Sequence, residues 1–192
     1  AGTGGSAIGF RNETAADGAS AIGSGNVADG HASSALGHGN AASGGSAVAV
    51  GSDNGAAGEA STAVGVRNTA GADFSVAVGS DNSASGDAAT AMGSANNASG
   101  QVSTAMGMAN GAYGDRSVAM GRSSYAYGDD AAALGMSSNA WGMRSAAVGL
   151  RSNAGGNDSA ALGTLATAWG AGSLAVSAFA SGEASPDDLD LD

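Results

Sequence analysis

The chain has 192 residues, of which 35 are Gly, one is Pro and none is Cys. Its 17 acidic residues outnumber six Lys and Arg and give a net charge of −11, which disfavours a nucleic-acid partner because phosphate backbones are also negative. The absence of Cys excludes disulfides and thiolate metal sites. No apolar run is long enough to span a membrane, and the first residues do not read as a signal peptide.

One glycine column recurs every fourteen residues, from Gly9 to Gly163. Each of these glycines follows a large aliphatic residue or Met, and that residue always follows Ala. The aliphatic column continues one period further than the glycines. Its thirteen members are Ile8, Ile22, Leu36, Val50, Val64, Val78, Met92, Met106, Met120, Leu134, Val148, Leu162 and Val176. Such strict register predicts a repeat architecture.

A shorter motif lies half a period away. Its Ala column begins at Ala28, and Gly follows two residues later in most periods. A column of Asn runs from Asn12 to Asn110 and then changes to Ser. Asn and Gly tolerate left-handed backbone angles, so we expect turns at these positions. Near the start, Ala16-Asp17-Gly18 reads two residues late, which predicts a frayed first coil.

Each period therefore reads as strand, turn, short strand and turn. Fourteen residues are too few for a helical repeat, which needs about 33. The sequence predicts an all-β, parallel β-roll or solenoid, with coils about 4.8 Å apart in a rod about 60 Å long. We assign residues 1–177 to about 12–13 coils and residues 178–192 to an irregular end with an acidic tail.

Strand alternation assigns side chains to the two faces. In Ser61-Thr62-Ala63-Val64, Ser61 and Ala63 share one side, and their small size suits the narrow interior of such a coil. Val64 and its column then point outward as a continuous apolar stripe, which predicts self-association along the rod. The opposite assignment, with the aliphatic column inside and Ala outside, remains open at this point.

The repeat resembles the head repeat of the YadA-like trimeric autotransporter adhesins, which reads Asn-Ser-Val-Ala-Ile-Gly-x-x-Ser. Residues 116–124 (Arg-Ser-Val-Ala-Met-Gly-Arg-Ser-Ser) are similar to it, although the first position is rarely Asn. The resemblance implies a left-handed roll and three chains side by side as a homotrimer. Together with the outward apolar stripe, this makes the aliphatic column the expected trimer interface. It also implies display at the bacterial cell surface, outer membrane-anchored through segments absent from this sequence. Direct membrane contact by this part is not expected.

Four aromatic residues occupy one column of the shorter motif: Tyr113, Tyr127, Trp141 and Trp169. They are candidates for ligand binding, because aromatic residues are enriched at binding hot spots. The alternative is that they pack in a groove between chains or cover the rod surface. The acidic column from Glu59 to Asp129 either holds a cation or is solvated. Charges of alternating sign lie on successive coils in two columns, and they predict ion-pair ladders that fix the coil register. One column contains Asp53, Arg67 and Asp81, and the other contains Arg116, Asp130, Arg144 and Asp158.

No catalytic constellation, cofactor site or metal site is expected. The two histidines, His31 and His38, lie in different columns without partner motifs. The sequence therefore favours a non-enzymatic adhesin head that attaches to host extracellular matrix or a cell-surface protein. The alternatives are an ice-binding or purely structural surface solenoid; the mixed Ser, Val, Thr and Ala column before the invariant Ala disfavours ice binding. An acyltransferase solenoid would need longer coils and a catalytic His.

Overall fold

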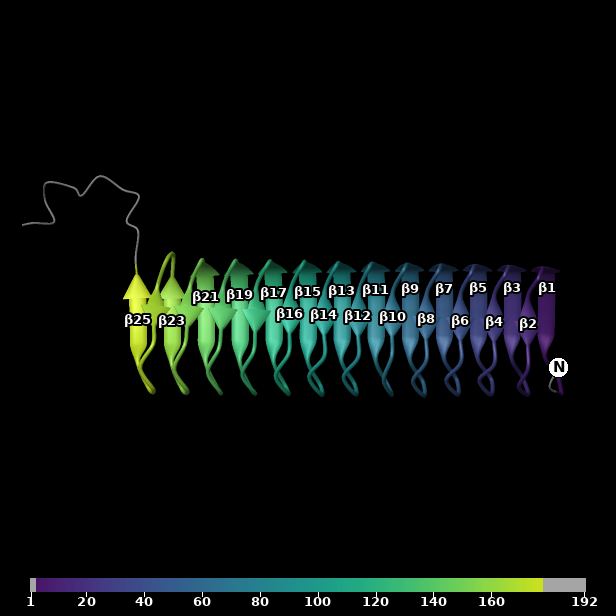
Figure 1. Cartoon of the computed structure of the whole chain (residues 1–192), viewed down its shortest axis with the longest axis horizontal. Coiled ribbons are helices and arrows are strands. Elements are labelled where there is room, and N and C mark those ends of the chain that lie inside the picture. The colour runs from purple at the N-terminus through teal and green to yellow at the C-terminus, as the bar shows by residue number, and fades with distance from the viewer. Residues whose placement is uncertain (1–2, 178–192) are drawn as a thin grey trace, which may run out of the picture.

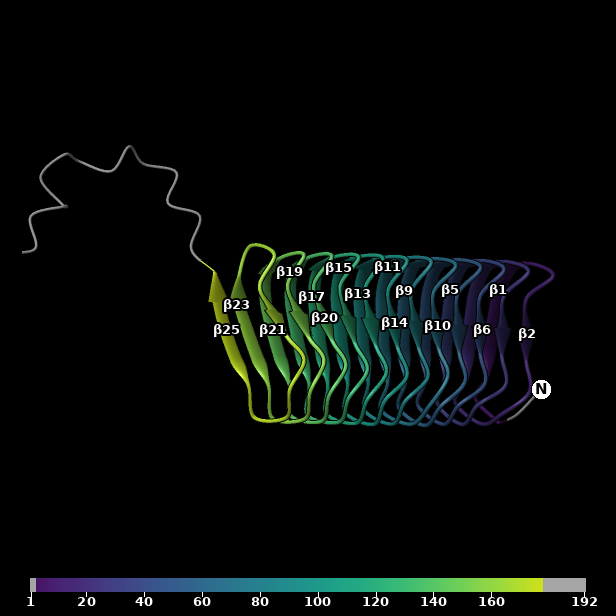
Figure 2. The same cartoon turned by 60° about the vertical axis from the view of Figure 1, so that its left-hand side comes forward.

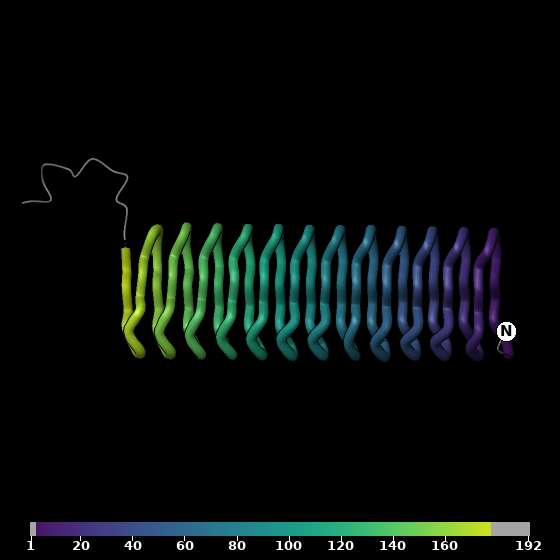
Figure 3. Tube along the Cα trace, viewed as in Figure 1, coloured from purple at the N-terminus to yellow at the C-terminus, as the bar shows by residue number. Residues whose placement is uncertain are grey.

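The computed structural model describes residues 3–177, which form a rod of stacked β-coils (Figures 1 and 3). The expected acidic tail lies outside the described residues. Thirteen strands of four or five residues form one sheet: β1 (Ser6–Phe10), β3 (Ser20–Ser24), β5 (Ser34–His38), β7 (Val48–Ser52), β9 (Thr62–Val66), β11 (Val76–Ser80), β13 (Thr90–Ser94), β15 (Thr104–Met108), β17 (Val118–Arg122), β19 (Ala132–Met136), β21 (Ala146–Leu150), β23 (Ala160–Gly163) and β25 (Leu174–Ser177).

Twelve two-residue strands form the second sheet: β2 (Glu13–Thr14), β4 (Val27–Ala28), β6 (Ala41–Ala42), β8 (Gly55–Ala56), β10 (Thr69–Ala70), β12 (Ser83–Ala84), β14 (Asn97–Ala98), β16 (Gly111–Ala112), β18 (Tyr125–Ala126), β20 (Asn139–Ala140), β22 (Asn153–Ala154) and β24 (Thr167–Ala168). Each coil adds one strand to each sheet, and every pairing is parallel with partners fourteen residues apart, as in Val64↔Val78. The turned view shows the coils as flattened loops in a row (Figure 2). The predicted parallel β-solenoid is confirmed.

The interior consists almost entirely of Ala, Ser and Asn side chains. Ala63 of a long strand and Ala70 of a short strand are both fully buried, as are their counterparts from Ala21 to Ala161 and from Ala28 to Ala154. Val64 and its column are half-buried or exposed on the outside. The two sheets lie too close for larger side chains to fit between them. The outward orientation predicted for the aliphatic column is therefore confirmed, and the opposite assignment is wrong.

The Gly column is required by close contact between coils. A Cβ atom on Gly65 would lie 2.0 Å from the carbonyl oxygen of Gly79, and the φ of Gly65 is +122°. The glycines of the shorter motif meet the same restriction, since a Cβ on Gly30 would lie 1.9 Å from the carbonyl oxygen of Gly44. Both columns thus let backbone approach backbone where a side chain would separate the coils.

The Asn column differs from the prediction. These residues do not adopt left-handed angles; the residue before each one does, as at Asp53 (φ 56°) and Arg67 (φ 52°). Asn68 is buried, and its Nδ2 donates to the carbonyl oxygens of Val64 and Gly79 and to Oδ1 of Asn54. The left-handed turn predicted for each Asn is therefore made by the residue before it. The side-chain amide of the Asn belongs to a buried ladder of hydrogen bonds.

The first coil is also more regular than predicted. β1 pairs with β3 and β2 with β4 at the same spacing of fourteen residues, without a shift. Gly18 has a φ of +69° and occupies the left-handed position that Ala32 takes one coil later. Ala16-Asp17-Gly18 is therefore in register. The substitution of Ala16 for the usual Gly produced the impression of a late motif.

Candidate functional surfaces

A flat, uncharged face covers the outside of the 13-stranded sheet. Two columns point outward on it, the aliphatic column and the column two residues earlier, which contains Ser, Thr, Val, Ala and Leu. Neither column contains a charged residue in any of the thirteen strands. Leu36 is 45% exposed and Met120 is 39% exposed. An apolar stripe of this length is typical of an interaction surface.

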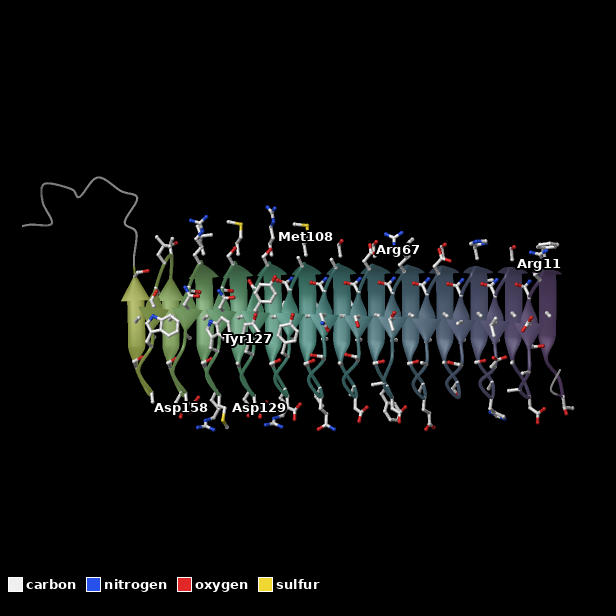
Figure 4. The ribbon with its side chains drawn as sticks, viewed as in Figure 1. Arg11, Arg67, Met108, Tyr127, Asp129 and Asp158 are labelled. Atoms are coloured by element: carbon white, nitrogen blue, oxygen red, sulfur yellow. The ribbon has the colours of Figure 1, made fainter. Side chains whose placement is uncertain are left out.

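Aromatic side chains gather on the opposite face, outside the 12-stranded sheet (Figure 4). The ring centroids of Tyr113 and Tyr127 lie 5.2 Å apart, and those of Tyr127 and Trp141 lie 4.1 Å apart in a stacked arrangement. Tyr125 lies beside them, with its ring centroid 6.1 Å from that of Tyr127. Burial among these rings raises the pKa of the Tyr127 hydroxyl, and the nearby Tyr113 and Tyr125 raise it further.

Trp169 extends this aromatic patch. A Cβ atom on Gly155 would lie 2.1 Å from Cε3 of Trp169, so the indole lies over the Gly155 backbone, one coil back along the rod. Gly155 occupies the aromatic column between Trp141 and Trp169. Because it has no side chain, the indole of Trp169 can lie over it. The four predicted aromatic residues thus occupy one face. Tyr125 was missed, although its position two residues before Tyr127 places both on the same side of a short strand.

Charged residues lie mainly along the two long edges of the rod. We define the upper edge as the last residue of each long strand and the residue after it. The lower edge comprises the two residues at equivalent positions to Glu59-Ala60 in each lower turn. Figure 4 shows Arg11, Arg67 and Met108 at the upper edge and Asp129 and Asp158 at the lower edge. The two edges are formed by opposite ends of the same coils.

Three arginines form ion pairs with an aspartate one coil further along. Nε of Arg67 lies 2.6 Å from Oδ1 of Asp81, and the same arrangement joins Arg116 to Asp130 and Arg144 to Asp158. In each pair the hydrogen bond from the guanidinium is the main cause that lowers the pKa of the carboxyl. The predicted ion-pair ladders are therefore confirmed for these three steps, while Asp53 hydrogen-bonds to Ser52.

The acidic column of the lower edge has a structural role. Oδ1 of Asp73 accepts a hydrogen bond from the backbone N–H of Glu59, and Oδ1 of Asp115 accepts one from Gln101. Oδ1 of Asp129 likewise accepts a hydrogen bond from the backbone N–H of Asp115. These carboxylates satisfy turn N–H groups of the preceding coil. Within residues 3–177, no group of three or more His, Asp or Glu residues could hold a metal ion.

The remaining sequence candidates do not converge. His31 and His38 are both exposed and lie on opposite edges of the rod. The described part of the chain contains no pocket in which acid–base or nucleophilic groups could act together. Nowhere between residues 3 and 177 is there a helix with the length and apolar character that a membrane crossing requires.

A family model described as the YadA head domain repeat, in two copies, matches six segments: residues 28–54, 56–82, 84–110, 112–138, 128–152 and 154–176. Together they cover more than half of the chain. The chain belongs to the YadA head repeat family. A search of curated proteins gave no match.

The YadA head match agrees with the coil boundaries seen in the structure. The first four matched segments begin at residues 28, 56, 84 and 112, in steps of 28 residues, which is two coils. One copy of the family repeat therefore corresponds to one coil of the rod. YadA head repeats are adhesin-type structural domains and are not known as enzymes, and their family points to the bacterial cell surface.

Proposed function

We propose that this chain forms the head of a homotrimeric adhesin on the bacterial cell surface and attaches the cell to a host matrix or cell-surface protein. The observation that carries the proposal is the uncharged outer face of the 13-stranded sheet, together with the family match. Three copies that place this face toward a common axis remove thirteen aliphatic side chains of each chain from water. Each buried side chain of this kind contributes about 1.5–3 kcal/mol.

The aromatic patch supports the adhesive part of the proposal. Tyr113, Tyr127, Trp141 and Trp169 lie outside the other sheet, so assembly through the long-strand face leaves them accessible. Aromatic rings provide large contact areas with little loss of side-chain freedom, and they are enriched at binding hot spots. The patch also presents the amides of Asn139 and Asn153, which hydrogen-bond to each other beside the rings.

Sedimentation velocity of purified Val78→Asp tests the assembly. Three buried carboxylates near the axis would lack partners, so we expect monomers where the unchanged chain forms trimers. Ser83→Asp is the control, because it adds the same charge to the same coil on the outside of β12. Circular dichroism establishes that both variants are folded. Equal stoichiometry for the two variants would contradict assembly through this face.

Binding of the purified protein to an array of matrix proteins tests the adhesive role. We expect Tyr127→Ala with Trp141→Ala to abolish binding while the trimer remains intact. Thr69→Ala, on the same face three coils or more away, serves as the control and retains binding. Binding that survives the aromatic double substitution would remove the patch from the proposed ligand site, and absence of binding across host ligands would favour a purely structural rod.

A further inference from the structure

The two edges of the rod differ in charge once internal ion pairs are set aside. On the upper edge, Arg11, Arg122 and Arg151 have no carboxylate within ion-pair distance among the described residues, and Asp53 is the one acid left. The lower edge retains six acids and no arginine. These acids are Asp17, Glu59, Asp73, Asp87, Asp115 and Asp129. One edge is therefore net positive and the other net negative.

The same edges carry exposed apolar side chains at related positions. The lower edge has three large ones, Phe74, Val102 and Met143. Phe74 is 62% exposed, and Phe74 and Val102 both adopt left-handed backbone angles, with φ of 58° and 57°. Such angles are unfavourable for bulky or β-branched residues, and strain of this kind is concentrated at functional sites. The turn sets this angle in the neighbouring coils too, as at Ala60 and Ala88, so it is the choice of bulky, exposed residues at this position that the single chain does not explain.

The two edges cannot meet within one chain. A five-residue strand separates them by about 17 Å. Copies related by rotation about an axis parallel to the rod have equivalent residues at the same height, which is the position along that axis. An upper turn of one copy therefore faces two lower turns of the neighbouring copy. These are the lower turns that precede and follow the upper turn in the sequence. Those turns lie about half a coil, roughly 2.4 Å, below and above.

At equal height the two edges match in chemistry. Arg122 lies level with the lower turns that contain Asp115 and Asp129. The three exposed apolar residues of the lower edge each meet an apolar residue of the upper edge: Val66 is level with Phe74, Met108 with Val102, and Met136 with Met143. The match has exceptions. Asp53 is level with Glu59, and the apolar residues Val66, Met108 and Met136 each also lie level with an acid of the lower edge, at Glu59, Asp115 and Asp129.

We propose that neighbouring copies of this chain pack edge to edge, with the upper edge of one against the lower edge of the next. Arg122 then lies between Asp115 and Asp129 of the second copy, while Val66, Met108 and Met136 contact the apolar residues at their own height. Contact between two different edges is a head-to-tail interface, which closes into a ring when the rotation permits. The inference rests on the proposed self-association and adds its register and its edge residues.

Cysteine cross-linking tests the register, because the chain contains no Cys of its own. Val66→Cys with Phe74→Cys, and separately Met136→Cys with Met143→Cys, place both thiols at one height on opposite edges. With a mild oxidant or a short bismaleimide, we expect covalent oligomers up to the trimer on denaturing gels. Val66→Cys with Met143→Cys is the mismatched control, with thiols more than five coils apart along the rod, and we expect at least tenfold less cross-linked product.

A charge test measures self-association by sedimentation velocity, as for Val78→Asp. Arg122→Ser is expected to weaken self-association about tenfold, as loss of one partner from an interfacial ion pair does. Ser85→Asp changes the net charge equally at an exposed position directly after β12 and is expected to leave association unchanged. Asp115→Asn with Asp129→Asn keeps the oxygen that accepts the turn N–H and is expected to match Arg122→Ser.

The outcomes separate the two proposals. Monomers in the unchanged protein would overturn the proposed function and this inference together. Trimers that cross-link equally through matched and mismatched cysteine pairs, or not at all with either reagent, would overturn the edge pairing alone. Trimers that tolerate Arg122→Ser as well as Ser85→Asp would overturn the assigned role of Arg122.

Discussion

At the residue scale, the structure separates glycines that are required from glycines that are not. Gly65 has a φ of +122° and no room for a Cβ, because the Gly79 carbonyl oxygen lies 2.0 Å from that position. Gly55, in the short strand of the same region, has open space around its Cβ position and no positive φ. The two residues are ten positions apart in the sequence and have opposite requirements.

We expect Gly65→Ala to lower the free energy of unfolding by at least about 2 kcal/mol, since neighbouring backbones must separate and the φ is strained. Gly55→Ala is expected to raise it by about 0.4–1 kcal/mol through lower entropy of the unfolded chain. Urea unfolding followed by circular dichroism measures both. Similar shifts for the two variants would show that coil contact at Gly65 is more adaptable than the structure indicates.

The buried serines give a second contrast. The Ser117 hydroxyl is buried with no hydrogen-bond partner among the described residues, whereas that of Ser75 donates to the Ala72 carbonyl oxygen at 2.6 Å. Both stand in a column where Ala also occurs, as at Ala89. A buried hydroxyl without a partner costs about 1–3 kcal/mol.

We therefore expect Ser117→Ala to stabilise the protein by about 1 kcal/mol. Ser75→Ala, which loses a hydrogen bond, is expected to destabilise it by about 0.5–1.5 kcal/mol. Thermal unfolding of both variants beside the unchanged protein gives the sign of each effect. Destabilisation by Ser117→Ala would mean that its hydroxyl does have a partner, such as an ordered water.

At the scale of elements, the sequence predicted the strands and their register, because period and alternation are direct consequences of β geometry. It favoured the correct assignment of the two faces but left the opposite one open. It did not predict the Asn ladder. Turn statistics assign Asn to left-handed positions, and the backbone does turn there, but one residue earlier. One signal in the sequence indicated this shift. Gly is accepted at any left-handed position, yet it never occurs in the column from Asn12 to Asn110. It does occur in the column one residue earlier, at Gly25 and Gly39.

The Asn ladder predicts a large effect at its centre and a small one at its end. Asn68→Ala leaves the Val64 and Gly79 carbonyl oxygens, and the N–H of Asn82, without their buried partners. We expect a loss of at least about 3 kcal/mol, because several buried groups lose hydrogen bonds together. Ser152→Ala, whose hydroxyl has no partner among the described residues, is expected to change stability by less than about 1 kcal/mol. Equal effects in urea unfolding would show that the ladder is not cooperative.

At the scale of the whole molecule, the apolar stripe followed from the sequence because all its members share one column. The contrast between the edges did not follow from the sequence, since it depends on which residues share an edge and which charges are paired within the chain. Arg122 and Asp129 lie seven residues apart but on opposite edges, and Arg116 and Arg144 are neutralised by Asp130 and Asp158 within the chain. Only the coil geometry shows which charges remain unpaired. The aromatic patch was predictable in part. Four of its members share one column, whereas Tyr125 occupies the column two residues earlier.

The three ion pairs predict how the stability of the rod depends on pH. Hydrogen bonds from Arg67, Arg116 and Arg144 lower the carboxyl pKa values of Asp81, Asp130 and Asp158 in the folded chain. A lowered folded pKa contributes stability above the unfolded pKa, and that stability is lost as the pH falls through the folded pKa. The variant with Gln at all three arginines lacks this contribution.

We expect the triple Gln variant to unfold at lower urea concentration than the unchanged protein at pH 7. The difference should shrink as the pH falls below the ordinary Asp pKa of about 3.9, where the carboxylates of the unfolded chain become protonated first. Asn at the three aspartates is the reciprocal control and should also converge with the unchanged protein in acid. A difference that stays constant from neutral to acidic pH would show that the arginines act through packing of their side chains along the edge and not through these carboxylates.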